Sequence, residues 1–348
     1  MKHYVGLDVS MKETFVCVVN QEGKRIKEKS LPTMPCEIHR YLQSLELDIE
    51  LVGLESGSLS HWLTTELANL GLRVKCIDAR HIAAVLSINI NKTDRNDGRG
   101  IADAMRCGLY KEVRAKNPDQ IALGTLLNSR KQIVEQRVQL LNCIRGLLKP
   151  FGIRLGALGQ TAKSIKLIRA QLPKIPEIAS KAIENQLRVL EIVIESIKEL
   201  DKQVKQQVRK ESHAELLMSV PGVGPVTALR YLTEICDPSR FRKSKSVGAY
   251  VGMTPKQYSS GETHKQGRIS KCGPKELRSL LTEAGIVILT RTKSWSKLKA
   301  WGLRLQKKHG LKKAAIAVGR KLSVMMHRML LTGERFRFTD CLEETKAA

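Results

Sequence analysis

Four acidic residues in the first third of the chain have the types and spacing for metal-dependent chemistry. Asp94 and Asp97 are three residues apart, so they share one face of a helix expected over 93–107. Asp8 and Glu55 are expected within and just after strands that could deliver them to the same point. Four converging carboxylates repel one another unless divalent cations neutralise them, and oxygen ligands suit Mg²⁺. The set predicts two-metal phosphoryl transfer on nucleic acid. The simpler alternative is a structural Asp8 and a helix-capping Glu55.

The elements that must position these acids follow a βββαβαβα order from residue 3 to about 115. Alternating and helical periodicity predicts strands over 3–9, 14–20, 25–31, 50–54 and 72–77, helices over 36–45, 59–70, 79–87 and 93–107, and a loop over 88–92. Asp8 then lies in the first strand, Glu55 follows the fourth, and the other two acids lie on the last helix. Three antiparallel strands followed by alternating helices and strands are the ribonuclease H-like plan, which RuvC resolvases share. Gly98 and Gly100 lower the helix propensity of the acid-bearing segment.

The charge of the chain is strongly positive and unevenly distributed. The formal net charge is +26 and the pI is about 9.9 over 348 residues. Residues 1–60 carry 7 Lys or Arg against 9 Asp or Glu, a net of −2, whereas residues 240–337 carry 24 against 4, a net of +20. A solvated basic surface is one explanation, but so large and local an excess favours a polyanionic partner, namely nucleic acid.

The cysteines and the apolar segments bear on the compartment. The 8 cysteines are scattered, with no Cys-x-x-Cys pair and no cluster at zinc spacing. This pattern predicts free thiols in a reducing cytoplasm. The N-terminus leads directly into a strand, and no apolar run approaches the length of a membrane span.

Two long helices are expected in the middle of the chain, over 118–150 and 177–211. The first carries two adjacent seven-residue stripes, Leu126, Ile133, Leu140 and Leu147 beside Leu127, Val134, Leu141 and Leu148. The second has a seam with steps of three and four, formed by Leu187, Leu190, Ile194, Ile197, Asp201, Val204 and Val208. This is a coiled-coil pattern with a polar residue at Asp201. The seam could pack within the chain or between subunits, and the pattern alone leaves both open.

A glycine-rich turn between two helices is expected within 213–235. Gly222 and Gly224 allow a tight turn, and the backbone N–H groups that start the following helix can bind a DNA phosphate without reading sequence. This is a helix-hairpin-helix signature. A plain turn between helices is the alternative.

Ser260 is expected in a glycine-flanked loop with several cations nearby in the sequence. A serine hydroxyl can attack a phosphate when metal or cationic neighbours stabilise the developing charge. On local sequence alone, however, Ser-Ser-Gly is usually a turn. We predict that the neighbouring cations bind nucleic-acid phosphates, as does Lys92 beside the acids; these residues are Lys265, Arg268, Lys271 and Arg278.

The C-terminal stretch 275–332 is expected to be helical and basic. Trp295, Leu298 and Trp301 recur at helical spacing, so we expect both tryptophans to be core residues. The tail from Thr339 is acidic.

At this point the order of short motifs resembles a known family, the DEDD insertion-sequence transposases, understood as bridge-RNA-guided DNA recombinases. The resemblance covers nearly the whole chain, and the order and spacing of the pieces carry it. The pieces are Gly6-Leu7-Asp8-Val9-Ser10, Glu55-Ser56-Gly57, Lys92-x-Asp94-x-x-Asp97, Pro221-Gly222-Val223-Gly224-Pro225, Asp237-Pro238-Ser239-Arg240-Phe241, Tyr250-Val251-Gly252-Met253-Thr254-Pro255, Ser260-Gly261 and Gly267-Arg268-Ile269-Ser270-Lys271-x-Gly273.

The resemblance implies a RuvC-like domain over 1–115, a coiled-coil region over 116–212, a transposase domain over 213–337 and a tail over 338–348. It implies that Asp8, Glu55, Asp94 and Asp97 bind Mg²⁺ and that Ser260 attacks DNA to form a covalent phosphoserine link. It further implies a homo-oligomer, a dimer or a tetramer of paired dimers, whose two catalytic halves meet between subunits. A structured noncoding guide RNA would pair with donor and target DNA.

Two other functions remain open from the residues. A RuvC-like Holliday-junction nuclease would hydrolyse DNA with metal-activated water and use Ser260 only structurally. A non-catalytic nucleic-acid scaffold would retain its activity without Asp8 or Asp97.

Overall fold

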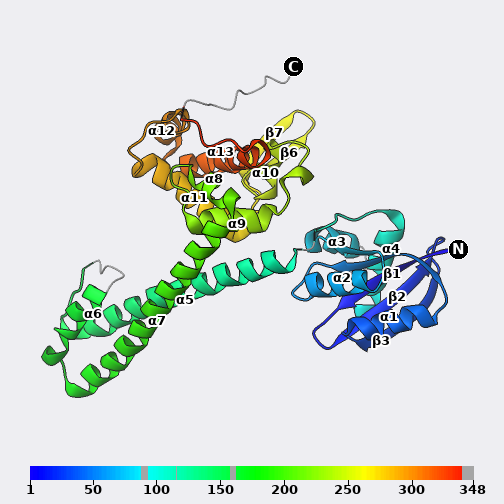
Figure 1. Cartoon of the computed structure of the whole chain (residues 1–348), viewed down its shortest axis with the longest axis horizontal. Helices are drawn as coiled ribbons and strands as arrows, with labels where there is room; N and C mark the ends of the chain where they lie inside the picture. The colour runs from blue at the N-terminus through cyan, green and yellow to red at the C-terminus, as the bar shows by residue number, and fades with distance from the viewer. Residues whose placement is uncertain (88–92, 115, 157–161, 339–348) are drawn as a thin grey trace. The chain divides into compact units, whose positions relative to one another are not determined.

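The computed structural model divides the chain into two compact units, Met1–Asn117 and Pro118–Ala348 (Figure 1). It describes residues 1–87, 93–114, 116–156 and 162–338. The predicted loop 88–92, with Lys92, and most of the tail therefore lie outside the described residues. The further division of the second unit near residue 212 stays a prediction.

The first unit is built on a mixed sheet. Within the described residues its strands are β1 (Lys2–Val9), β2 (Glu13–Asn20), β3 (Arg25–Pro32), β4 (Asp48–Glu55) and β5 (Val74–Ile77), in the order β3-β2-β1-β4-β5. β1 pairs antiparallel with β2, which pairs antiparallel with β3. On its other side β1 pairs parallel with β4, which pairs parallel with β5. The predicted strands are confirmed, and the arrangement is consistent with a ribonuclease H-like plan. Glu55, expected just after a strand, is the last residue of β4.

Helices cover the two faces of this sheet. They are α1 (Pro35–Ser44), α2 (Ser60–Asn69), α3 (Ala79–Leu86) and α4 (Asp94–Cys107). Val5 and Leu7 of β1 pack in one core cluster with Ile38 of α1 and Leu63 of α2. Because strand side chains alternate between faces, the neighbouring residues of β1, such as Gly6, point to the opposite face of the sheet, which α4 covers.

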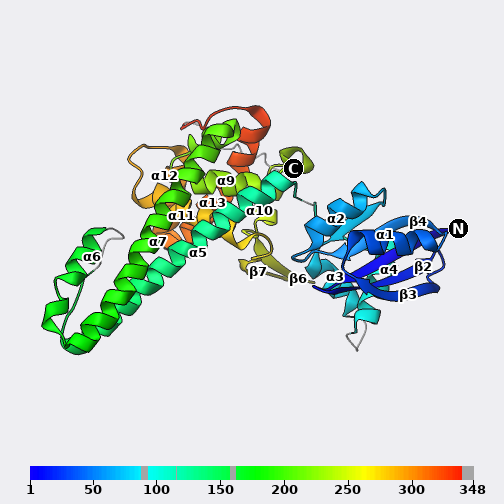
Figure 2. The same cartoon turned by 60° about the horizontal axis from the view of Figure 1, so that its bottom comes forward.

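Two long helices dominate one part of the second unit. α5 (Pro118–Leu148) and α7 (Glu177–Lys210) lie side by side in Figures 1 and 2, joined through η1 (Lys149–Phe151), α6 (Ala162–Arg169) and η2 (Leu172–Lys174). The predicted seam is the buried side of α7: Leu187, Leu190, Ile197, Val204 and Val208 are all buried. Arg130 of α5 contacts the polar seam residue Asp201 at 2.5 Å. The seam therefore packs within the chain.

The rest of this unit is mainly helical. It contains α8 (Ser212–Met218), α9 (Pro225–Ile235), η3 (Pro238–Arg240), α10 (Lys245–Tyr250), β6 (Pro255–Ser260), β7 (Thr263–Ile269), α11 (Lys275–Thr290), α12 (Lys297–His309) and α13 (Leu311–Thr332). A large aliphatic core joins these helices to the adjoining parts of α5 and α7.

Two smaller expectations have different outcomes. The prediction for Trp295 was wrong: its side chain is 64% exposed, because it lies in the link before α12, where helical spacing does not apply. The seven described cysteines are free thiols, as expected. Among the described residues, no helix combines the length and apolar character that a membrane crossing requires.

Candidate active site

Asp8 and Glu55 are neighbours across two parallel strands. Leu7 of β1 pairs with Leu54 of β4, so the residues that follow them in the two strands lie side by side. Two residues earlier, Gly6 and Gly53 both face α4: a methyl group added to Gly6 would lie 2.0 Å from the carbonyl oxygen of Gly98. Because strand side chains alternate, Asp8 and Glu55 belong to this same face.

The direction of α4 brings the other two acids to the same end. At its C-terminal end, Arg106 donates a hydrogen bond to the carbonyl oxygen of Gln21 at 3.4 Å, in the turn beside the start of β1. Gly98 instead lies against Phe15, which is the pairing partner of Asp8. The helix therefore runs antiparallel to β1, and its first turn, with Asp94 and Asp97, lies at the carboxyl end of β1.

The first turn of α4 is fixed by a cap and an ion pair. Thr93 accepts a hydrogen bond from the backbone N–H of Asn96 at 3.2 Å. Arg95 forms a salt bridge with Glu28 of β3 at 2.8 Å. Burial alone would raise the pKa of Glu28, but hydrogen bonds and positive charge from Arg95 and Arg25 outweigh it and lower that pKa. This pairing ties the acid-bearing turn to the edge of the sheet.

The residues at this end suit a hard divalent cation, because all four supply carboxylate oxygens. Asp8 and Asp97 are half-buried, whereas Glu55 and Asp94 are exposed. In the described part of the chain, no three carboxylate, histidine or cysteine side chains are already grouped closely enough to hold an ion. The backbone thus brings the four acids to one end of one face, and rotation of their side chains would have to complete a site.

Ser260 is the last residue of β6, at a tight hairpin. The prediction of a loop at Ser260 was wrong, because β6 and β7 pair as far as Ser260 and Thr263 and leave a turn of only two residues. Gly261, the first of two loop residues, has φ of +54°, as a type II′ turn requires. Both Ser259 and Ser260 are exposed.

The hairpin distinguishes the two adjacent serines. The hydroxyl of Ser259 lies 3.1 Å from Nδ1 of His264, its cross-strand partner. Ser260 points to the opposite face of the strand, which it shares with Tyr258 and with Lys265, the partner of Tyr258. A cation therefore lies on the face of Ser260.

The base of the hairpin is held by close backbone contacts. A methyl group added to Gly273 would lie 1.9 Å from the carbonyl oxygen of Tyr250. The N–H of Lys271, whose φ is +56°, donates to the carbonyl oxygen of Gly252 at 3.0 Å. Arg278 donates to the carbonyl oxygen of Val251 at 3.1 Å. Lys271 and Arg278, both predicted to bind nucleic acid, thus also hold the hairpin in place.

Comparison with known proteins identifies the family. A family model described as a transposase, of the DEDD and IS110 type, matches residues 5–152. A second, described as the transposase IS116/IS110/IS902 family, matches residues 214–300. The chain belongs to this transposase family. The first match covers all four acids, and the second covers Ser260 and its hairpin.

Relatives of this transposase match it along most of their length. The transposase for insertion sequence element IS1111A of Coxiella burnetii is 27% identical over 96% of this chain and 91% of its own length. The transposase for insertion sequence element IS1328 of Yersinia enterocolitica is 27% identical over 78% and 81%. The pilin gene-inverting protein of Moraxella bovis is 26% identical over 96% and 98%. The transposase is thus a DNA phosphoryl-transfer enzyme, and its DEDD domain implies a divalent metal ion.

The glycine-rich turn of the transposase joins α8 to α9. Gly222 has φ of +83°, and a methyl group added to it would lie 2.9 Å from the carbonyl oxygen of Ala284 on α11. Packing therefore accounts for this glycine. Gly224 is the residue before α9 and has open space around it, so a phosphate could approach the start of that helix here.

Sequence reasoning missed His264, the Arg95–Glu28 pair and the contact between Gly6 and Gly98. The signal for His264 was available, since Gly261-Glu262 separates two runs that could pair as a hairpin. The other two depend on contacts between residues far apart in the sequence, which no local pattern indicates.

Proposed function

We propose that this transposase cleaves and rejoins DNA through a covalent phosphoserine intermediate on Ser260, with Mg²⁺ held by Asp8, Glu55, Asp94 and Asp97. The observation that carries the proposal is the convergence of the four acids at the carboxyl ends of β1 and β4. The placement of an exposed serine at the end of β6, with Lys265 on the same face, supports the second part.

The residues have distinct tasks in this scheme. The Oγ of Ser260 forms a bond to phosphorus while the bond from phosphorus to the leaving sugar oxygen breaks; the hydroxyl proton passes to solvent, and the leaving oxygen takes one up. Bound Mg²⁺ would neutralise charge on the phosphate oxygens. Lys265 and Arg268, both exposed on β7, position the DNA backbone by its phosphates, and the start of α9 at Gly224 binds a further phosphate.

Two further parts of the proposal concern partners. A structured noncoding guide RNA selects donor and target DNA by base pairing. The net charge of +26 supports this part, because so large a positive charge suits binding to both DNA and RNA. The active protein is a homo-oligomer, a dimer or tetramer, in which acids and serine come together from different subunits. The gene-inverting relatives favour recombination over simple cleavage, because inversion requires rejoining of strands.

Hydrolysis by metal-activated water, as in a RuvC-like junction nuclease, is the second candidate. It is favoured by one feature, that all four acids lie in the first unit, whereas the serine lies in the second. The two candidates differ in whether protein stays attached to DNA.

The test is a denaturing gel of end-labelled donor DNA incubated with the protein, Mg²⁺ and the RNA that copurifies with it. We expect a labelled protein–DNA adduct with the wild type, none with Ser260→Ala, and a retained adduct with Ser259→Ala, the matched neighbour on the other face of β6. Cleavage without any adduct, or an adduct that persists in Ser260→Ala, would contradict the serine step. Sequencing the copurified RNA tests the guide separately.

A further inference from the structure

The last third of α7 carries a row of cations outside the sites described above. Lys198, Lys202, Lys205 and Arg209 are spaced by four, three and four residues, so they fall on one side of the helix. We call these four residues the basic stripe. Residues 198–210 hold five Lys or Arg against two Asp or Glu, a net of +3, whereas residues 177–197 hold two against four, a net of −2. The positive charge of α7 is therefore concentrated in one segment.

Neighbouring acids do not cancel this charge. The carboxylate of Asp201 lies in the same region but contacts Arg130 of α5 at 2.5 Å. Lys198 pairs with Glu195 at 2.8 Å, and its side chain is still 66% exposed. In the part of the chain that the structure describes, Lys205 and Arg209 form no salt bridge. Within the described residues these two cations therefore have no ion-pair partner, and all four side chains of the stripe are exposed.

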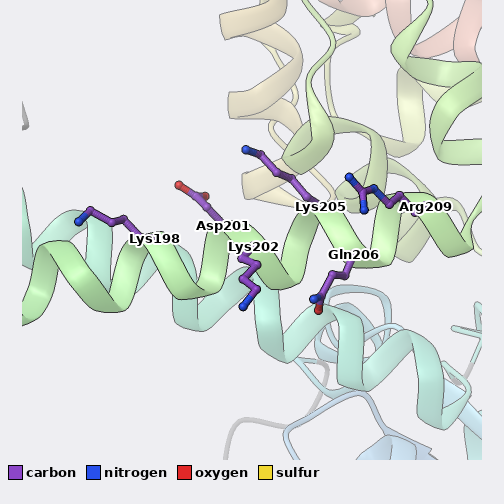
Figure 3. A pocket seen from close by; sticks show the side chains of 6 residues that line it. All are labelled: Lys198, Asp201, Lys202, Lys205, Gln206 and Arg209. Carbon is purple, nitrogen blue, oxygen red and sulfur yellow. The ribbon is translucent and has the colours of Figure 1, made fainter.

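The stripe borders a shallow hollow. The hollow has a volume of about 430 Å³, and its lining consists of the stripe with Asp201 and Gln206. In Figure 3 the side chains diverge from this side of α7, with Lys205 and Arg209 extending one way and Lys202 the other. No apolar side chain lines it, which suits a polar anionic ligand better than an apolar one.

The basic stripe lies on a helix that is held straight by packing against a second long helix. The adjacent side of α7, with Ile197, Val204 and Val208, is buried, and α7 packs along α5. From Lys198 to Arg209 the helix rises by about 16 Å. A straight row of charge over that length matches a polymer that is itself straight at this scale, and duplex DNA, with a persistence length of about 50 nm, is such a polymer.

We propose that the basic stripe binds the phosphate backbone of double-stranded DNA without reading its sequence. DNA is the polymer that a transposase acts on, and duplex DNA presents about one negative charge per 1.7 Å of its axis to such a row. The stripe anchors DNA beyond the reacting phosphate. This binding requires neither Mg²⁺ nor the serine step, so it stands or falls separately from the proposed mechanism.

The test compares variants of the full-length protein for binding to a labelled duplex of about 30 base pairs, without Mg²⁺, as salt is varied. Lys205→Gln with Arg209→Gln removes the two cations of the stripe that form no salt bridge with any described residue, and glutamine keeps the helix propensity. We expect the slope of log affinity against log salt to become shallower by about 1.8, since each phosphate contact contributes about 0.9. Neutralising all four cations should reduce the slope by about 3.6.

The matched control is Lys181→Gln with Arg188→Gln, two exposed cations of the same helix that pair with Glu177 and Glu184. The control should bind as the wild type does, and circular dichroism should show equal helix content in all variants. An unchanged slope in the double variant, or an equal loss in the control, would overturn the proposal. A loss confined to an RNA duplex of the same length would also overturn it.

Discussion

In the first unit the acidic residues lie on elements whose backbones touch, whereas in the second unit Ser260 lies on an exposed hairpin. A methyl group added to Gly6 of β1 would lie 2.0 Å from the carbonyl oxygen of Gly98 on α4, and one added to Gly98 would lie 2.9 Å from the ring of Phe15 on β2. The hairpin, in contrast, is held mainly at its base, where Gly252 packs against Cys272.

This difference fits the demands of the two chemistries. Metal coordination tolerates little variation in the positions of its ligands, so the acids benefit from a core that fixes them. A nucleophile on an exposed strand end can approach a large substrate such as DNA. The contrast leads to three predictions, in order of decreasing effect.

The largest effect should follow from loss of one acid. We expect Asp8→Asn to slow DNA cleavage on the order of a thousandfold, because a bound cation supplies several kcal/mol and about 1.4 kcal/mol is a factor of ten. The rate is measured on labelled DNA with Mg²⁺ titrated. The control is Asp103→Asn, which changes an acid of α4 that pairs with Arg106 of the same helix, and it should keep nearly the wild-type rate. Equal losses in the two variants would show that Asp8 has no special role.

A second effect concerns the close packing in the first unit. A methyl group in Gly6→Ala would lie 2.0 Å from the carbonyl oxygen of Gly98 and 2.5 Å from the N of Ala102, so α4 must move away. We expect a loss of about 3 kcal/mol in the free energy of unfolding of this unit, measured by urea titration.

Gly57→Ala is the matched control, since nothing lies within 4 Å of an added methyl group there. It should change the free energy of unfolding by less than about 0.5 kcal/mol. A Gly6→Ala protein as stable as the control would mean that the contact does not hold the acid-bearing helix.

The smallest effect concerns the ion pair that ties α4 to β3. The folded-state pKa of Glu28 is lowered from its ordinary value of 4.5, so the stability it contributes is present above that value and is lost as the pH falls through the lowered pKa. Arg95→Gln should therefore cost about 0.5 kcal/mol at neutral pH, the range of partly exposed pairs, and almost nothing in strong acid.

Urea titrations of wild type and variant at both pH values measure this difference. Arg40→Gln, which removes an exposed pair with Glu37 on α1, gives the comparison for a pair outside the site. A difference that grows as the pH falls would contradict the assignment.

Much of the fold followed from local signals. Strand alternation located Asp8 on β1 and put Glu55 one residue beyond the strand that it in fact ends, and the predicted helix over 93–107 located Asp94 and Asp97 on α4. The seam of α7 was readable for the same reason, because side-chain periods of 2 and 3.6 residues depend only on neighbours along the chain.

Tertiary structure decided what periodicity could not. The sequence suggested that Gly98 and Gly100 weaken the helix, but α4 is continuous, and Gly98 is where β1 and the helix approach each other. Likewise, only strand pairing shows that Ser259 faces His264 while Ser260 faces the other way. These outcomes depend on contacts between distant segments, whose geometry is set by packing of the whole unit and has no local signature in the sequence.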